Sequence, residues 1–310
     1  MILSIECVPL IQKKITLEKT GIKEYRVVKR IESAVGLGID FCYMSKILGQ
    51  DCNLLSFIGQ GNSSKLYQSI LNKDGIYNIP VEIKDKIGEH LIIEYSDRVE
   101  LIRDNDIRIV GEEINKFFKS ISDVILDYNI VFISYDNINV IEDDALKLIL
   151  NNAVKNNVKL LLRIDQINYK YIFGVALDTC LVDVDTLEEI LNIRLLSNTE
   201  IIKAANYLLE QNVKEAVFVI KDDNFFVVNK ERVFEIEVNA LAKEGINTGY
   251  FMAGVANSIN RAYDIEMMIR LAFACGLINR DDLHETSLAT IKENMKKINI
   301  ITYNNIEWRD

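Results

Sequence analysis

Histidine and cysteine, on which most metal centres and hydrolytic triads depend, are scarce or scattered in this chain. His90 and His284 are the only two histidines in 310 residues, which disfavours a histidine-based zinc site or a Ser-His-Asp triad. The five cysteines are odd in number and show no C-x-x-C spacing. This pattern indicates reduced, buried thiols, as expected of a cytoplasmic protein.

Positive charge and long apolar runs are scarce as well. The 36 Lys and Arg residues are outnumbered by 46 Asp and Glu residues, for a formal net charge of −10. This balance argues against a nucleic-acid partner, which requires clustered cations, but does not exclude a single bound nucleotide. No apolar stretch approaches the roughly 18 residues of a membrane helix. The apolar start at Met1–Glu6 lacks a basic leader and is interpreted as a first strand.

Short apolar runs alternate with longer helical patterns, which predicts an α/β fold with a mostly parallel sheet covered by helices. Strands are predicted at Ile2–Cys7, Cys52–Ile58, Ile130–Ser134, Leu160–Ile164, Cys180–Val184 and Ala216–Ile220. Helices are predicted at Asp40–Leu48, Ser63–Asn72, Glu142–Asn156, Asp185–Leu191 and Glu200–Glu210, and residues 250–297 are predicted to form two or three packed helices. Residues 1–310 are expected to form a single domain.

Two segments, at about 14–35 and 81–109, depart from this rhythm. They mix β-branched residues with charges, and their apolar positions often alternate, as in residues 89–97. Alternation of this kind is typical of strands in a sheet with one exposed face. A small second sheet is therefore predicted from these two segments.

The segment from Lys243 to Ala256 carries the strongest functional signal. It has two glycines in a loop that runs into a helix of small and apolar residues. Backbone N–H groups at such a junction can cradle a phosphate, and the helix dipole favours the negative charge. This segment resembles the C-terminal signature of the phosphofructokinase-B (ribokinase-like) carbohydrate kinases, in which Gly-Ala-Gly-Asp precedes a helix carrying Ala-Gly one turn later.

Anchored on Ala253-Gly254, the family signature falls on residues 246–249. The position of the family's catalytic aspartate is therefore Gly249, which leaves the base position vacant. No aspartate occurs anywhere between Asp223 and Asp264, so a short deletion does not restore the acid.

The resemblance extends over essentially the whole chain and is closest to the 1-phosphofructokinase and tagatose-6-phosphate kinase branch. The first signature, Gly-Gly-Lys-Gly-Ile-Asn, matches residues 35–40, and Asn-Pro-Ser-Ile-Asp matches residues 8–12. Leu48-Gly49, Phe57-Ile58-Gly59 and Asp74-Gly75-Ile76 also fit. The resemblance implies a ribokinase-like three-layer αβα sandwich with a β lid, formed by the two departing segments, over the sugar site.

The sugar side of the site would be formed by Gln12, Gly36, Gly38 and Asp40. Two of the matched positions have lost their usual chemistry. Leu37 replaces the lysine that offers an ammonium to the substrate phosphate, and Gln12, a neutral amide, replaces an aspartate that accepts sugar hydroxyls.

The nucleotide side would use ATP and Mg²⁺, with Asn247, Thr248 and Gly249 at the helix start. The family's Asn-x-x-Glu motif matches Asp185 and Glu188, and Glu188 would organise the metal. A carboxylate pair at this spacing shares one helical face and could hold hydrated Mg²⁺. The same residues also suit an ordinary helix start with an N-cap Asp185, and the sequence leaves both interpretations open.

The glycine-rich turn that covers the nucleotide in the family matches Lys221–Phe225, which has lost both glycines. A hairpin between residues 217–220 and 225–228 is predicted there instead. The main hypothesis is a catalytically impaired carbohydrate kinase homologue that acts as a ligand-binding or regulatory protein.

Two alternatives remain open from the sequence. One is an active sugar or sugar-phosphate kinase with a rearranged site that uses Glu188, Glu244 or an acid of the lid. The other is a related enzyme for a non-sugar acceptor. Under any of these hypotheses, the apolar face expected around His90–Tyr95 predicts a homodimer formed through the lid.

Overall fold

We describe the protein from a computed structural model, which describes residues 1–21, 24–104, 107–134, 144–164, 174–211, 213–221, 224–237 and 245–305. Within these ranges, no helix is both long and apolar enough to cross a membrane. All five cysteines lie in the described part of the chain, and none forms a disulfide.

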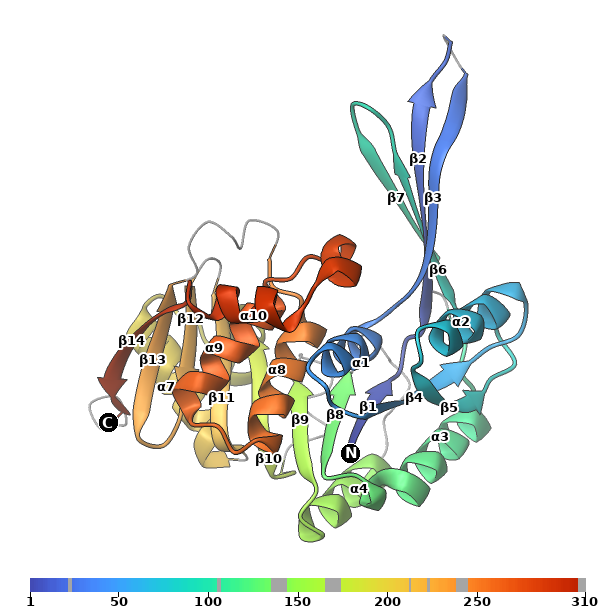
Figure 1. The fold of residues 1–310 in the computed structure, drawn as a ribbon. Helices are drawn as coiled ribbons and strands as arrows, with labels where there is room; N and C mark the ends of the chain where they lie inside the picture. Colours follow the sequence, from blue (N-terminus) through green and yellow to red (C-terminus); the bar gives the residue numbers. More distant parts are fainter. Residues whose placement is uncertain are drawn as a thin grey trace.

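A ten-stranded sheet forms the centre of the molecule, in the order β14-β13-β12-β11-β10-β9-β8-β1-β4-β5 (Figure 1). Seven strands are parallel: β1 (Ile2–Glu6), β4 (Cys52–Ile58), β5 (Tyr77–Glu82), β8 (Ile130–Ser134), β9 (Lys159–Arg163), β10 (Leu177–Asp183) and β11 (Val213–Lys221). Three antiparallel strands extend the β11 edge: β12 (Asn224–Val228), β13 (Arg232–Glu237) and β14 (Asn299–Asn304).

Helices cover both faces of this sheet. One face is packed by α1 (Leu37–Ile47), α8 (Thr248–Asn260), α9 (Ile265–Gly276) and α10 (Leu288–Met295). The other is packed by α3 (Gly111–Val124), α4 (Asp144–Lys155), α6 (Val184–Leu191) and α7 (Asn198–Gln211). α2 (Asn62–Lys73) packs on α1 and the adjoining strands, and the described residues also include two short 3₁₀ helices, η1 (Ile125–Asp127) and η3 (Arg280–Glu285).

Alternation along the central strands explains why the sheet has two buried faces. In β1, Leu3 and Ile5 join the core on the α3 side, whereas Ile2 joins the core on the α8 side. In β8, Ile133 and Phe132 divide in the same way. Because successive side chains of a strand point to opposite faces, an unbroken apolar run fills both cores. The predicted three-layer αβα sandwich is confirmed.

A second sheet of four strands projects from one end of the molecule (Figure 1). It contains β2 (Leu10–Lys19), β3 (Tyr25–Val35), β6 (Gly88–Glu94) and β7 (Val99–Asp104), in the order β3-β2-β6-β7. We call this sheet the lid. The predicted segments contain most of it, but β2 begins at Leu10 rather than at residue 14, and residues 81–82 belong to β5 of the main sheet.

Candidate substrate and nucleotide site

Asn247 joins the start of α8 to α1. Its Oδ1 accepts the Tyr250 N–H at 3.0 Å, which caps the helix, and its Nδ2 donates to Oδ2 of Asp40 at 3.0 Å. The Asn247 backbone N–H donates to the Gly276 carbonyl at 2.9 Å. The side chain of Asn247 is therefore already used to hold the two helices together.

Gly249 lies in the first turn of α8, where it packs directly against α1. A Cβ added at Gly249 would lie 2.6 Å from the Asp40 Cβ and 2.9 Å from the Phe41 nitrogen, and closer still to the carbonyl oxygen of Leu37. Real Cβ atoms do not approach other atoms so closely, so no side chain fits at residue 249 without moving a helix. The space into which a catalytic side chain would extend is filled by α1.

Asp40 is the acidic residue that contacts Gly249. The residue is only 4% exposed, and Nη2 of Arg280 lies 2.6 Å from its Oδ1. The two groups attract each other by charge alone, because Asp40 Oδ1 accepts no hydrogen bond. Burial raises the pKa of Asp40, opposed by the Arg280 charge and by the Asn247 hydrogen bond.

Arg280 comes from η3, far along the chain from α1, and was not identified from the sequence. Its Nη2 also donates to the Ala34 carbonyl at the base of the lid, at 3.0 Å. Arg280 therefore ties α1, the lid and η3 together at one point.

Glu6 occupies the loop formed by Gly36 and Gly38. This residue ends β1 and is 1% exposed. Its Oε2 accepts the Gly38 N–H at 2.8 Å and its Oε1 accepts the Val8 N–H at 3.0 Å. A Cβ at Gly36 would lie 2.7 Å from the Glu6 Cδ, so the positive-φ glycine (153°) lets the loop close over the carboxylate. The N-terminus of α1 thus contacts the chain's own negative charge.

Gln12 lines a cavity of about 190 Å³ between the base of the lid, α1, the end of α2 and η3. Arg280, Tyr43, Lys73 and Asp281 share this lining. Gly36, Gly38 and Asp40 do not line it, although Asp40 pairs with Arg280 of the lining. The cavity is smaller than the 300–1,000 Å³ typical of ligand pockets.

Lys14 holds the lid over this cavity. Its Nζ lies 2.8 Å from the Glu94 carboxylate and 2.9 Å from the Asp281 carboxylate of η3. Hydrogen bonds from the lysine to Glu94 and then to Asp281 raise the pKa of Lys14. The lid and η3 are thus joined on the side that faces the body of the protein.

The predicted metal-side residues lie on α6. Asp183, rather than Asp185, caps this helix by accepting the Thr186 N–H at 2.7 Å. The carboxylate of Glu188 accepts the Leu195 N–H at 2.8 Å and pairs with Arg194 at 2.7 Å. The Leu195 bond is the main cause of the lowered pKa of Glu188.

Both oxygens of Glu188 thus bind the segment that follows α6. The described residues contain no cluster of three His, Cys, Asp or Glu side chains arranged to hold a metal. Glu244, one of the acids that the active-kinase alternative names as a base, lies outside the described residues, as do Asp222 and Asp223 of the predicted hairpin turn. The hairpin on either side of that turn is present, with Ile220 opposite Phe225.

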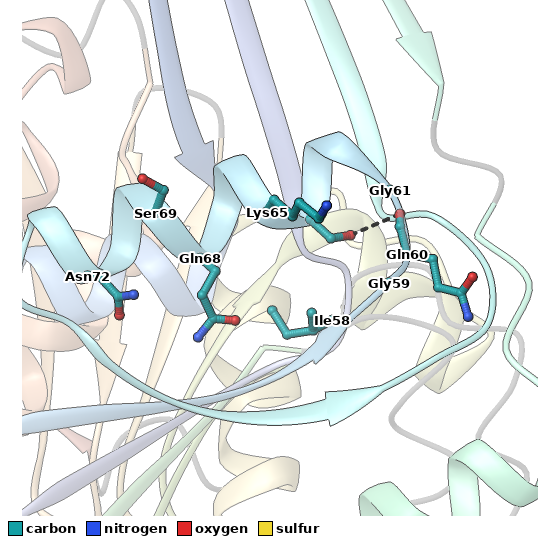
Figure 2. Close-up of a pocket in the computed structure, with 9 residues that line it drawn as sticks. Ile58, Gly59, Gln60, Gly61, Lys65, Gln68, Ser69 and Asn72 are labelled. Atoms are coloured by element: carbon teal, nitrogen blue, oxygen red, sulfur yellow. Dashed lines mark hydrogen bonds between the residues drawn. The ribbon is translucent and has the colours of Figure 1, made fainter.

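A separate hollow of about 640 Å³ runs along α2 and contains none of the predicted site residues. Lys65, Gln68, Ser69 and Asn72 extend from the helix, and Ile58 approaches from β4 (Figure 2). Gly59 packs against the chain at Asp85 and Ile87, so the loop before α2 is closely held. This hollow lies outside the candidate site.

The sequence matches no protein-family model and no curated protein. The fold, in contrast, matches solved structures over nearly the whole chain. A structure described as a "possible 1-phosphofructokinase" from Thermotoga maritima is 18% identical, with a TM-score of 0.81 and coverage of 97% of this chain and 99% of that one.

Phosphofructokinase-2 from Escherichia coli in complex with fructose-6-phosphate is 15% identical, with a TM-score of 0.77 and coverage of 95% and 98%. The tetrameric inhibited form of the same enzyme gives a TM-score of 0.76 at 15% identity, with the same coverage. The chain therefore has the ribokinase-like fold of the phosphofructokinase-type sugar kinases, as its motifs predicted.

Proposed function

We propose that this protein is a phosphofructokinase-B-type carbohydrate kinase homologue that binds a sugar or sugar phosphate and transfers phosphate poorly or not at all. The observation that carries the proposal is the packing of Gly249. A Cβ at residue 249 would overlap Leu37 and Asp40, so this position can present no base to a hydroxyl. General-base assistance is worth about 10²–10⁴ in rate, so turnover should fall by at least this order relative to ordinary kinases.

The charges around the site support the same proposal. The Gly36–Gly38 loop is occupied by Glu6, and the buried Asp40 is neutralised by Arg280. Leu37 offers no cation to a substrate phosphate. The two described acids nearest these positions, Glu6 and Asp40, are thus already paired within the chain.

The residues present do not fit ATP and Mg²⁺ well. The N-terminal turn of α8 packs on α1, where Thr248 is 8% exposed, and the Asn247 side chain takes the Tyr250 N–H. Glu188 is committed to Leu195 and Arg194. We therefore expect weak binding of Mg-ATP, and no catalytic step is assigned to it.

The cavity beside Gln12 is the proposed ligand site. Lys73 and Arg280 on its lining suit the phosphate of a sugar phosphate, and Gln12 can both donate to and accept from hydroxyls. The solved complex of Escherichia coli phosphofructokinase-2 contains fructose-6-phosphate, which favours the same ligand class. Because the cavity is small, binding is expected to require movement of the lid.

The test combines binding and turnover on one panel of sugars and sugar phosphates. Thermal shift without nucleotide should show stabilisation by at least one sugar phosphate, and an assay of ADP release with Mg-ATP should show little product. Gln12→Ala should weaken the shift, whereas Gln68→Ala, in the separate hollow along α2, should not. ADP release at about 1–100 s⁻¹, the range of working kinases, would refute the proposal.

The alternative is an active kinase with a rearranged site, for which Asp40 is the best-placed described carboxylate. Its position beside Gly249 favours this candidate, whereas its ion pair with Arg280 and its burial oppose it. If Asp40 were the base, Asp40→Asn would abolish ATP-dependent turnover and leave the thermal transition cooperative.

We also propose that the lid mediates a homodimer. The strand register places Leu91 beside Ile102 and Ile15 beside Ile93 on the lid face opposite to Lys14. Ile102 is 54% exposed. Lys14 pairs with Asp281 of η3, so the face that carries Lys14 is the one turned toward η3. A second copy of this lid face would cover Leu91, Ile93 and Ile102, because a two-fold axis brings identical patches together. Light scattering coupled to size-exclusion chromatography should give the mass of a dimer.

A further inference from the structure

A groove of about 790 Å³ lies on the helical layer formed by α8, α9 and α10, and the C-terminal end of α1 also lines it at Leu48. Apart from Leu48, its lining residues lie between Asn257 and Lys296 in the sequence. None of them belongs to the candidate site described above. Its volume falls within the range of small-molecule pockets.

All the charged side chains that line this groove are cationic: Arg261, Arg270, Lys292 and Lys296. The chain as a whole has a formal net charge of −10. The charge of the groove lining, with four cations and no acid, is therefore opposite in sign to that of the whole chain. A concave surface lined by one sign of charge concentrates ligands of the opposite sign.

Two of these cations are already engaged. Arg270 donates to the Ile298 carbonyl at 2.6 Å, and Lys296 pairs with Glu293 at 2.7 Å. Arg261 and Lys292 have no ion pair or side-chain hydrogen bond with any described residue. They are the two charges that remain available to a ligand.

The rest of the lining is largely apolar and partly open to solvent. Tyr263 and Met267 are each 40% exposed and Leu288 is 50% exposed, whereas Leu271 and Ile291 are buried beneath them. Large exposed apolar side chains that gather in one concavity indicate a surface that a ligand covers. The groove therefore combines an apolar floor with two available positive charges.

We propose that this groove binds a small amphipathic anion, with an apolar body against Met267 and Leu288 and a carboxylate or phosphate at Arg261 and Lys292. Both head groups accept charge-assisted hydrogen bonds from Arg and Lys. The site is independent of the sugar cavity and does not rest on the proposed function.

The experiment uses the full chain and four probes that share a ten-carbon chain: decanoate, decyl phosphate, decanol and decyltrimethylammonium. Binding is measured by isothermal titration calorimetry below the micelle concentration of each probe. At least one anionic probe should bind saturably with unit stoichiometry and more tightly than both decanol and the cation. The preference between the two anions identifies the head group.

Three variants locate the binding. Arg261→Ala with Lys292→Ala should weaken the anion by about tenfold or more, the scale of a lost charge-assisted hydrogen bond. Met267→Glu should also repel the anion, while an acid at this third position of α9 suits the cap formed by Asp264. Lys119→Ala on α3, on the other side of the sheet, is the charge control and should bind as the parent does.

Circular dichroism of each variant separates a lost site from a lost fold. The proposal is overturned if neither anion binds saturably, if decanol or the cation binds as tightly as the anions, or if folded groove variants retain the parent affinity.

Discussion

Asp40 and Arg280 form an ion pair that links α1 to η3, with 2.6 Å between Oδ1 and Nη2. The Asp40 side chain is 6% exposed and that of Arg280 is 28% exposed. A buried carboxylate that loses its cation retains the full cost of its desolvation. The pair is therefore expected to affect both the packing of η3 on α1 and the pH dependence of stability.

Replacement of Arg280 by methionine should destabilise the protein by about 3 kcal/mol. This is the lower end of the range for breaking a buried pair, because part of the arginine reaches solvent. Urea unfolding followed by circular dichroism measures the change. Arg232→Met is the matched control, since its pair with Glu266 is exposed and 4.0 Å long, and it should change stability by less than about 0.5 kcal/mol. Equal effects of the two substitutions would contradict this account of Arg280.

Asp40→Asn should become more favourable relative to the parent as the pH rises. Burial raises the pKa of Asp40 in the folded state, so the folded protein binds this proton more tightly than the unfolded chain. Stability from the carboxyl is then fully present below its unfolded pKa and is lost as the pH rises through the folded pKa. Asparagine does not titrate, so the difference in unfolding free energy, variant minus parent, should increase from pH 4 to pH 8. A difference that is flat or decreases would show that the ion pair dominates.

Gly249→Ala should destabilise the protein by about 1–3 kcal/mol, the usual cost of overpacking. The added methyl group would overlap the backbone of α1 at Leu37 and Phe41, which cannot yield as a flexible side chain could. Gly111→Ala is the control, because nothing lies within 4 Å of a Cβ at this helical position, and alanine favours a helix. Thermal denaturation should separate the two variants clearly.

Gly249→Asp, which restores the residue expected of the family, should be at least as unstable as Gly249→Ala and should gain no kinase activity. ADP release by a folded Gly249→Asp variant would show that α1 can withdraw from α8.

The sheet was predictable because its strands are buried and apolar. The predicted bounds of β4 and β8 agree with the structure, and the other predicted strands differ by a few residues at their ends. β5 was missed because Pro80 interrupts its apolar pattern, and the structure places this strand at a sheet edge, where proline is tolerated. β14 was missed because its alternating pattern is short and follows a helical region.

The site was less predictable because its contacts join distant parts of the chain. Glycine at residue 249 could be read from the sequence, but the approach of Leu37 that fills the space could not. Arg280 has no local motif that pairs it with Asp40. Glu6 gave a signal, since a charged residue at the end of a buried strand requires partners, but only the fold identifies the Gly38 N–H as one of them.

Glu6→Ala should destabilise the protein by about 1–3 kcal/mol, the cost of leaving buried donors without an acceptor. The substitution removes the acceptor of the Gly38 and Val8 N–H groups and the negative charge at the start of α1. Glu6→Gln keeps one oxygen for Gly38 and should cost less than Glu6→Ala. The two variants are compared by chemical denaturation, and an equal loss would show that charge rather than hydrogen bonding matters.

Ile102→Glu should dissociate the proposed lid dimer. Ile102 lies beside Leu91 on the lid face turned away from η3, and a carboxylate there would be desolvated at a two-fold interface. Leu101→Glu is the matched control, because Leu101 precedes it on β7, is 47% exposed and points to the opposite face. Light scattering at micromolar concentration should give a monomer for Ile102→Glu and a dimer for the parent and Leu101→Glu. A monomeric parent would remove the proposal, and a dimer broken only by Leu101→Glu would move the interface to the other face of the lid.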